Sequence, residues 1–590
     1  MHTGTFGNED DLPRVPLPGL EDSCERFIDW CAPLLTAAEL ASTKRAVAEF
    51  LRPDSPAHTL QSALEQYAAR DDVHSWLDEF WADRYLARRD RIALNANFFF
   101  LLEQSGRDQV DRAAELVAAA LDYKGTLDAE TAPPAEQRGS LLSMEQHKFL
   151  FSSTRIPGSQ RDTARTPYSP PWPGPSQERH IAVLFRSNLF HVEVIEEGGR
   201  PYPRAAIAGA LRRVMRDGAA EGVGVGALTT KPRAEWAASR QALLECHPAN
   251  QRALEEVETA LLCLCLEDTD PGSTRAVCRQ LLAGDPGNRW FDKAVSFVLF
   301  PDGSAGVNVE HCRLDGTTIL AFVDAVADRT VPPYARSRRE PDCRMIEFVL
   351  DDGLRADVRA AADAFAEYAA DTATELVSLE DFGAQRAKRL DMSPDAFVQL
   401  AYQLAHRRAR ARTGTTYESI ATRQFHHGRT EAMRVVTPET LRFVAAMDDP
   451  DADPVTRRTA LRAAAEADVR RAKKCQAGLA PEQHLWELQL LQRRVGEELG
   501  ATGALTLHDS PGWRIMRDDY LSTSSAASVN IRYFGFGATS DHCIGVAYVL
   551  LPDRLNVHLS TRRAGADEMH RFAVEFRHAV GALAGLLTPE

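Results

Sequence analysis

The sequence predicts a mixed α/β protein. In both halves of the chain, segments with helical spacing of apolar residues alternate with short runs typical of strands. This interleaving favours mixed α/β layers over separate all-α and all-β domains. The length of 590 residues, with 44% hydrophobic and 26% charged residues, is typical of a globular chain of about two to four domains.

The first half of the chain predicts helices around a set of strands. Apolar residues recur at helical spacing over 20–51, 60–88, 205–219, 233–245, around Val257 and over 317–327. Short β-rich runs occur at 181–185, 190–195, 294–300 and 307–310. The last two flank the turn Pro301-Asp302-Gly303 and predict a hairpin. The prolines between 153 and 178 predict a long irregular loop.

The second half continues the alternation. Ala-rich helical patterns lie at 354–376, 395–412, 454–474 and 564–587. Strands are expected at 529–534, 544–551 and 555–560. The same mixture of elements in both halves predicts a similar layered architecture in each.

The charge balance and composition limit the function and the location. Lys and Arg number 69 against 84 Asp and Glu, a formal net charge of −15, so the chain lacks the basic footprint that nucleic-acid binding requires. No run of about 18 apolar residues and no N-terminal secretion signal is present. We therefore expect a cytoplasmic protein with neither a membrane nor a nucleic-acid partner, and the Ala and Arg content suggests a bacterial one. Any anionic ligand must bind at a local basic patch.

Two motifs suggest a cofactor, but their context argues against one. Gly222-Val-Gly224-Val-Gly226-Ala227 satisfies GxGxxA, yet it follows a predicted helix instead of a strand, so we expect a turn and not a dinucleotide site. His426 and His427 are adjacent, and adjacent histidines on a regular element do not converge on a metal ion. The ten cysteines form no CxxC pair and are expected to be reduced thiols. No metal and no permanently bound cofactor is therefore expected.

The strongest local signal is an HxxxDG motif within Glu310-His311-Cys312-Arg313-Leu314-Asp315-Gly316, directly after a predicted strand. A neutral His fixed there suits a general base that takes a proton from a hydroxyl attacking a thioester. Asp315, one turn on, would fix the loop. A lone His at a strand end can equally be a packed core residue, so the motif alone leaves both interpretations open. HxxxDG is shared by His-dependent acyltransferases, including chloramphenicol acetyltransferase and nonribosomal peptide condensation domains.

The wider sequence resembles the carnitine/choline acyltransferase family. The matching segments occur in family order and cover nearly the whole chain: LPRVP at 12–16, STRIP at 153–157, LT at 228–229 with WA at 236–237, RWFDK at 289–293, DGSAG at 302–306, EH at 310–311, SPDAF at 393–397, TYES at 416–419, GRTE at 428–431 and LSTS at 521–524.

The resemblance implies a monomer of two chloramphenicol-acetyltransferase-like domains, each a mixed sheet flanked by helices, with an active-site tunnel at their interface. The domain carrying the catalytic His would be 95–353. The other domain, 1–94 plus 354–590, would bind the acceptor and coenzyme A and supply the oxyanion donor.

The resemblance also implies roles for individual residues. His311 would be the base, Asp315 would support its loop, and Ser524 would donate to the oxyanion of the tetrahedral intermediate, a charge that needs a fixed donor. The co-substrate would be acyl-CoA, held by Arg386, Lys388, Arg389, Ser393, Asp395 and Ser525. Ala384 stands where the family has a further lysine, which weakens this site or indicates that the thioester arrives on an acyl carrier protein.

The acceptor site shows a second departure from the family. The acceptor residues would be Tyr417, Ser419, Thr430, Gln483 and Ser522. Gln483 stands where carnitine enzymes have an arginine, and an amide cannot give a carboxylate the charge-assisted fork of a guanidinium. Choline enzymes also lack that arginine, but they lack the threonine as well. We therefore expect carnitine to be a poor acceptor and the true one to be an uncharged or differently charged alcohol or amine.

Arg532 is expected near the gate of the acyl pocket, where the family has Met for short chains or Gly for long ones. The alternation of the strand is equally consistent with a solvent-facing side chain.

The leading hypothesis is thus an O-acyltransferase that moves an acyl group from acyl-CoA to a small hydroxyl acceptor by direct attack. One alternative is acyl transfer from a carrier-protein thioester onto a biosynthetic product. The other is a non-catalytic binding protein.

Overall fold

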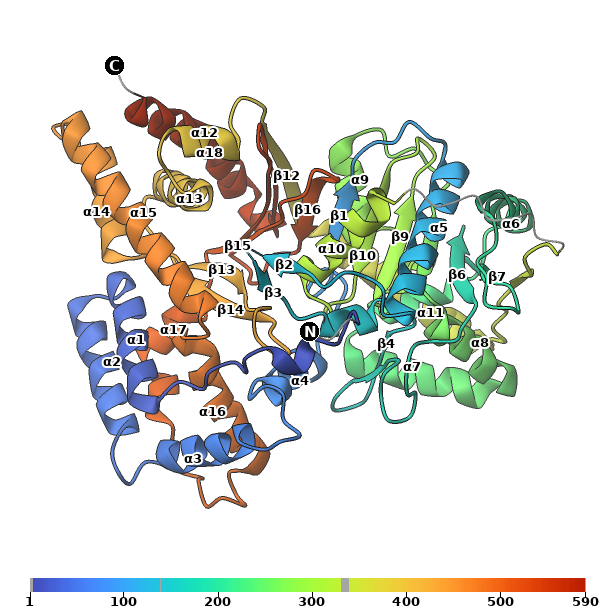
Figure 1. Cartoon of the computed structure of the whole chain (residues 1–590), viewed down its shortest axis with the longest axis horizontal. Helices are drawn as coiled ribbons and strands as arrows, with labels where there is room; N and C mark the ends of the chain where they lie inside the picture. The colour runs from blue at the N-terminus through green and yellow to red at the C-terminus, as the bar shows by residue number, and fades with distance from the viewer. Residues whose placement is uncertain (1–3, 138, 330–338, 589–590) are drawn as a thin grey trace. The chain divides into compact units, whose positions relative to one another are not determined.

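The computed structural model describes residues 4–137, 139–329 and 339–588. The chain divides into two compact units (Figure 1). The first unit comprises Met1–Glu9, Arg84–Thr374 and Ser528–Gly537, and the second comprises Asp10–Asp83, Glu375–Ala527 and Ala538–Glu590. The predicted division into 95–353 and 1–94 plus 354–590 differs from these units over residues 1–9, 84–94, 354–374 and 528–537. It assigns 528–537 to the second domain, whereas this segment pairs with a strand of the first unit.

The first unit is built on a mixed sheet. Among the described residues this sheet has eight strands in the order β11-β7-β6-β8-β9-β10-β1-β16. The strands are β1 (Phe98–Leu102), β6 (His180–Phe185), β7 (Asn188–Glu193), β8 (Cys263–Leu266), β9 (Val295–Leu299), β10 (Ala305–Val309), β11 (Cys343–Met345) and β16 (Ile531–Phe536). β8 is parallel to β6 and β9, and the other neighbours are antiparallel. β9 and β10 form the predicted hairpin.

Helices surround this sheet, and some of them pack mainly on other helices. They are α5 (Gln109–Asp128), α6 (Arg204–Asp217), α7 (Arg233–Cys246), α8 (Pro248–Thr259), α9 (Thr274–Leu282), α10 (Gly316–Ala327) and α11 (Asp352–Ala370). α9 contacts β1, β10 and β16, whereas α6 and α8 contact β6. Two small hairpins, β2 (Glu136–Gln137) with β3 (Ser140–Leu141) and β4 (Thr154–Ile156) with β5 (Thr163–Arg165), lie outside the main sheet. The second of them forms inside the segment predicted to be irregular.

The glycine-rich motif forms a close-packed turn ahead of a 3₁₀ helix, Val225–Thr230. Gly224 adopts a left-handed φ of 75°, and a Cβ at Gly226 would lie 2.1 Å from the carbonyl oxygen of Arg289. The glycines therefore allow a tight turn and a close backbone approach. Further 3₁₀ segments lie at Glu9–Asp11, Ala32–Leu34, Glu145–Phe149, Pro286–Asn288, Thr506–Asp509 and Arg563–Gly565.

The second unit has a smaller mixed sheet. In its described residues the strand order is β12-β18-β17-β15-β13-β14. The strands are β12 (Thr372–Leu379), β13 (Thr416–Ala421), β14 (Thr430–Arg434), β15 (Leu521–Ser525), β17 (Ile544–Leu550) and β18 (Leu555–Arg562). β15 is parallel to both β13 and β17, and β13 pairs antiparallel with β14. Two mixed sheets flanked by helices confirm the predicted fold class.

The helices of the second unit come from both ends of the chain. They are α1 (Leu20–Cys31), α2 (Ala37–Phe50), α3 (Pro56–Ala68), α4 (Asp78–Leu86), α12 (Ala384–Arg389), α13 (Pro394–Arg410), α14 (Pro438–Asp448), α15 (Pro454–Gln476), α16 (Pro481–Val495), α17 (Pro511–Met516) and α18 (Ala566–Leu587). α13 packs along α18, and α1 and α3 pack on α16. The helix predicted over 354–376 ends at Ala370, because the β-branched Thr372, Thr374 and Val377 continue the chain as β12.

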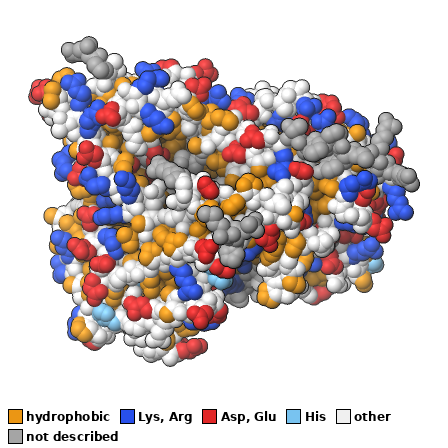
Figure 2. Space-filling model, viewed as in Figure 1, with side chains coloured by type: hydrophobic (Ala, Val, Ile, Leu, Met, Phe, Trp, Pro, Cys, Tyr) orange, Lys and Arg blue, Asp and Glu red, His pale blue; other side chains and the backbone are white. Residues whose placement is uncertain are grey.

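The surface carries both signs of charge. Figure 2 shows basic and acidic side chains interspersed over the visible face. None of the helices in the described part of the chain combines the length and the apolar composition needed to cross a bilayer.

A group of acidic residues lies inside the second unit, beneath the strands that carry the predicted acceptor site. The Tyr548 hydroxyl lies 2.6 Å from Asp395 Oδ1 and 2.8 Å from Glu418 Oε1. Because a hydroxyl donates only one proton, one of these carboxyls must itself be protonated to complete both contacts. Burial raises the pKa of Asp395 and of Glu418, and it raises the pKa of Asp468 on α15 to about 8.

We predict that Asp468→Asn flattens the pH dependence of stability. The folded state keeps the Asp468 proton up to about pH 8, whereas the unfolded chain releases it near pH 4, the ordinary range for an aspartate. The stabilisation from this group is therefore complete below pH 4 and is lost as the pH rises to 8. Urea unfolding of both proteins between pH 5 and 8.5 measures this, and the variant should gain stability relative to wild type as the pH rises. Glu466→Gln, at an exposed position of the same helix, is the matched control, and parallel pH profiles for wild type and Asp468→Asn would contradict the prediction.

Candidate active site

His311 lies just after β10, in the loop that leads into α10, with its side chain 27% exposed. Its Nδ1 is 2.6 Å from the carbonyl oxygen of Leu314. A carbonyl only accepts hydrogen bonds, so Nδ1 carries the proton and Nε2 is the basic nitrogen. The Tyr85 hydroxyl lies 3.3 Å from Nε2 and can donate to it. The ring of Tyr85 and the ring of Phe98 pack on the imidazole, with centroids at 4.9 and 5.0 Å.

Asp315 supports the loop as the N-cap residue of α10. One carboxylate oxygen lies 3.6 Å from His311 Nδ1, and the side chain is 3% exposed. Gln146 joins it through two hydrogen bonds: its Nε2 donates to Asp315 Oδ2 (2.8 Å) and its Oε1 accepts from the Asp315 backbone N–H (2.7 Å). Thr318 donates to the same Gln146 oxygen. The carboxylate and the loop are thus held in one orientation.

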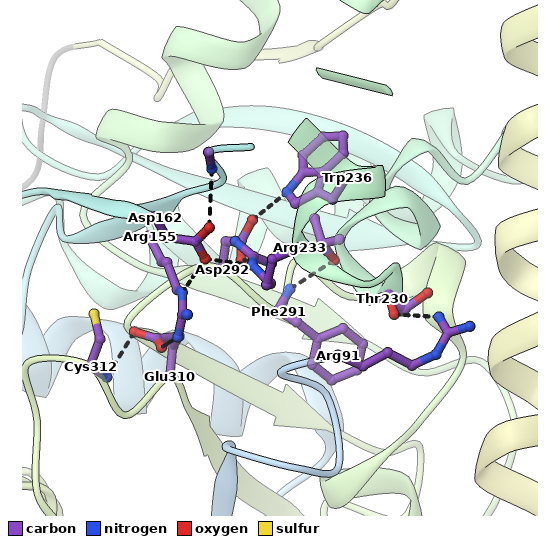
Figure 3. A network of polar contacts seen from close by, with 12 residues as sticks. Arg91, Arg155, Asp162, Thr230, Arg233, Trp236, Phe291, Asp292, Glu310 and Cys312 are labelled. Carbon is purple, nitrogen blue, oxygen red and sulfur yellow. Dashed lines mark hydrogen bonds and ion pairs between the residues drawn. The ribbon is translucent and has the colours of Figure 1, made fainter. Parts of the chain in front are cut away.

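A buried ionic network adjoins the His311 loop, and Figure 3 shows its members Arg155, Asp162, Arg233, Asp292 and Glu310. Arg155 Nη1 lies 3.2 Å from Glu310, the residue before His311, and its Nη2 donates to the backbone carbonyl of Tyr85 at 2.6 Å. The other Glu310 oxygen accepts from the backbone N–H of Cys312. One guanidinium therefore positions the histidine loop and the tyrosine that contacts its basic nitrogen.

The network continues away from the loop. Asp162 accepts from Arg155 Nε and from Arg233 Nε, each at 2.6 Å. Arg233 pairs with Asp292 at 2.8 Å, and the Trp236 indole donates to Asp292. Burial opposes the charge on Asp162, but Arg233 and Arg155 lower its pKa. Burial likewise opposes the charge on Arg155, and Glu310 and Asp162 raise its pKa. The pKa shifts of Asp162 and Arg155 thus both favour the ionised, paired state, whereas burial raises the pKa of Asp292.

The second unit gathers the predicted acceptor residues on one sheet face. Paired residues of neighbouring strands point to the same side. Tyr417 pairs with Ser522, Ala421 pairs with Thr430, and alternation adds Ser419 and Ser524 to that face. The residues brought together are Tyr417, Ser419, Thr430, Ser522 and Ser524. Thr523 points to the other side, where its hydroxyl donates to the Tyr417 carbonyl and accepts from Gln399.

Gln483 reaches the same strands from α16. It is 1% exposed, and its Nε2 donates to the carbonyl oxygen of Thr430 at 2.8 Å. That bond fixes the amide orientation, which leaves Oε1 buried with no hydrogen-bond partner among the described residues. Arg434, opposite Tyr417, is already neutralised by Glu482 at 2.7 Å and by Asp519.

The predicted coenzyme A residues differ in their exposure and in their contacts. Lys388 and Arg389 are exposed on α12, whereas Arg386 donates to the Asp381 carbonyl. Ser393 caps α13, and the exposed Ser525 ends β15. Asp395 is half-buried and accepts a hydrogen bond from the Tyr548 hydroxyl.

Arg532 lies in the first unit, at an irregularity in the β1–β16 register. It lines a pocket of about 360 Å³ with Leu101, Val277, Asp270, Asp302 and several Ser, Thr, Gly and Gln residues. Phe98, Phe100 and Phe534 form a separate ring cluster on the side of β1 that faces His311.

Sequence reasoning missed Tyr85 and Gln146. Tyr85 lies far from the HxxxDG motif in the sequence. It belongs to the 60–88 segment, whose apolar spacing predicts a helix but indicates no role for a single residue. Gln146 comes from a 3₁₀ segment with no motif of its own. Arg155 belongs to the quoted STRIP segment, but that segment by itself indicated no role.

Comparisons with known proteins show the family of the chain. The model of the Choline/Carnitine o-acyltransferase family matches residues 15–578. Carnitine O-acetyltransferase of Columba livia is 29% identical over 579 residues, covering 95% of this chain and 90% of that protein. Peroxisomal carnitine O-octanoyltransferase of Mus musculus is 30% identical over 512 residues, covering 83% of each chain. Mitochondrial carnitine O-palmitoyltransferase 2 of Mus musculus is 28% identical, covering 98% of this chain and 91% of that protein. On this evidence the chain belongs to the choline/carnitine O-acyltransferase family.

Proposed function

We propose that the protein transfers an acyl group from acyl-CoA to a hydroxyl of a small acceptor, with His311 as general base. Membership of the family supports O-acyl transfer as the class of chemistry. The observation that carries the assignment of the base is the 2.6 Å contact between His311 Nδ1 and the Leu314 carbonyl. It commits the proton to Nδ1 and leaves Nε2 as the proton acceptor.

The proposed reaction has two steps. Nε2 takes the proton of the acceptor hydroxyl as its oxygen attacks the thioester carbonyl, which gives a tetrahedral intermediate. The Ser524 hydroxyl donates to the oxyanion. The carbon–sulfur bond then breaks, and the leaving thiolate takes the proton back from Nε2. The Leu314 carbonyl and Asp315 stabilise the imidazolium that exists between the two steps.

We predict that His311→Ala lowers kcat by about a hundredfold or more, the usual size of a general base contribution. Ser524→Ala should lower kcat by about 10²–10³-fold. Thiol release from acetyl-CoA in the presence of an acceptor panel measures both. Ser525→Ala, at the neighbouring exposed serine proposed to contact coenzyme A, is the matched control for Ser524→Ala: it should raise the KM for acyl-CoA and keep kcat. A His311→Ala enzyme with wild-type kcat would contradict the assignment, and a wild type that releases no thiol with any acceptor would favour a non-catalytic binding protein.

The acceptor is proposed to be an alcohol or amino alcohol without a carboxylate. Gln483 presents a buried, unpaired Oε1 in the place of the family's arginine, and this lone pair favours a donor such as a hydroxyl or an ammonium group. A carboxylate would meet that oxygen unfavourably, and Arg434 on the same face is already paired with two acids. Carnitine therefore lacks the cation that its carboxylate needs.

We predict that Gln483→Arg raises kcat/KM for carnitine by about 10-fold or more, because a charge-assisted hydrogen bond contributes about 1.5–3 kcal/mol. Gln483→Glu, which is close in size but negative, should lower it. Initial rates with carnitine, choline and simple alcohols measure the change. Efficient carnitine acylation by wild type would overturn the proposed acceptor class.

The donor is proposed to bind through the exposed cations of α12. Lys388 and Arg389 project from this helix, and Arg386 is engaged with Asp381. An exposed cation adds a salt-sensitive attraction for the phosphates of coenzyme A.

We predict that Lys388→Ala raises KM for acyl-CoA severalfold with kcat unchanged, and that the difference shrinks at high salt because exposed charges are screened. Lys473→Ala, an exposed lysine on α15, is the control. An unchanged KM would remove Lys388 from the donor site and favour a carrier-protein thioester as the donor.

Four expectations from the sequence stay predictions: a bacterial source, a cytoplasmic location, a monomeric state and gating of the acyl pocket by Arg532.

A further inference from the structure

We propose that His74, His426 and His427 form a binding site for a divalent transition-metal ion, with Zn²⁺ the best match. The three side chains offer ring nitrogens that all lie within 4.8 Å of one another. Their ring centroids are 4.3, 4.6 and 4.7 Å apart. Tetrahedral Zn²⁺ with bonds of about 2.0–2.1 Å places its ligand nitrogens about 3.3 Å apart. Binding therefore requires the imidazoles to reorient until their nitrogens, now within 4.8 Å of one another, reach that spacing.

The loop between β13 and β14 overturns the expectation that His426 and His427 do not converge. That expectation holds for regular helices and strands, but Phe425 N–H donates to the Thr422 carbonyl and Gly428 N–H donates to the Phe425 carbonyl. His427 adopts a left-handed φ of 52°, which is uncommon outside glycine and most accessible to Asn, Asp and His. Two successive tight turns thus bring adjacent rings to one side of the chain.

His74 completes the group from the segment between α3 and α4. The two segments are already attached to each other in the second unit. The backbone N–H of His426 donates to the carbonyl of Pro13, and the next residue, Arg14, donates to the carbonyls of Ala68 and Arg70 at the start of the His74 segment. The guanidinium of Arg429 lies 5.0 Å from the ring of Trp81 on α4, at the other end of that segment. A metal ion would therefore bind to a largely preformed arrangement.

Asp78 supplies a carboxylate beside the three rings. Its Oδ1 is 3.9 Å from His427 Nδ1, a distance from which it can serve as a fourth ligand or orient a ligating imidazole. His426 is buried, while His74 and His427 are half-buried, so an ion can enter from solvent. Three imidazoles with one carboxylate suit Zn²⁺, Ni²⁺, Co²⁺ and Cu²⁺ and disfavour Mg²⁺ and Ca²⁺, which prefer oxygen ligands.

The position of the site indicates what the ion would do. The loop follows Ala421, which pairs with Thr430 at the end of the β13–β14 ladder. A bound ion would tie this hairpin end to the segment before α4. Because Thr430 belongs to the proposed acceptor face, ion binding should also lower the KM for the acceptor. This consequence rests on the proposed function.

The test is direct metal binding to the full chain after removal of metal with a chelator. We expect one equivalent of Zn²⁺ to bind at micromolar concentration or tighter in competition with a chromophoric chelator, and to raise the Tm. Co²⁺ at the same site should give visible absorption bands of tetrahedral intensity. His74→Gln and His427→Asn, the latter chosen because Asn tolerates a positive φ, should each weaken binding at least tenfold.

His578→Gln, an exposed histidine on α18, is the control for adventitious binding and should bind as wild type does. Equal Zn²⁺ affinity in wild type and in both site variants overturns the proposal, as does the absence of binding at a protein concentration of 100 µM. Binding and the Tm shift do not depend on the reaction, so they test the site even if the proposed function fails. Metal binding that leaves the acceptor KM unchanged overturns the coupling to the acceptor face alone.

Discussion

The geometry around His311 depends on the hydrogen bonds and ion pairs of the Arg155 guanidinium. It is fully buried and binds Asp162, Glu310 and the carbonyl of Tyr85 at once. Buried charges are tolerated because each is paired, and removing one partner of such a set typically destabilises a protein by about 3–5 kcal/mol. The same network therefore stabilises the first unit and fixes the imidazole. Because Gln146 and Asp315 hold the loop from the other side, the histidine has few alternative orientations, which is the condition for efficient proton transfer.

The second unit positions its polar residues by sheet register instead. The parallel pairing of β13 with β15 and the antiparallel pairing of β13 with β14 align Tyr417, Ser522 and Thr430 on one face. A slip of one residue would turn every one of them to the opposite side. Thr523 and Gln399 oppose such a slip through buried hydrogen bonds that exist in one register. The orientation of the Gln483 amide depends on its hydrogen bond to the Thr430 backbone carbonyl, so strand pairing also positions this side chain.

The sequence was informative where a pattern is local. The HxxxDG motif, the β9–β10 hairpin and most helices follow from spacing and turn residues. It was less informative for β13 and β15, because TYESIA and LSTSS contain few apolar residues and show no clean alternation. Tyr85 and Gln146 reach His311 only through tertiary contacts, which a single sequence does not encode in any local pattern. The convergence of His426 and His427 depends on one left-handed residue, and the helix predicted to 376 ends early because β-branched residues favour a strand.

The acidic residues buried around Tyr548 affect more than the packing of the second sheet. Burial raises the pKa of Glu418, and it raises that of Asp468 to about 8. The fold therefore favours the uncharged form of both side chains, and at neutral pH Asp468 is mostly protonated. The formal charge of −15 counts them as ionised and therefore overstates the negative field of the protein. An anionic thioester approaching the exposed cations of α12 meets a weaker electrostatic repulsion than the amino-acid count suggests. For the proposed acyl-CoA donor, protonation in the interior thereby reduces the repulsion that opposes binding.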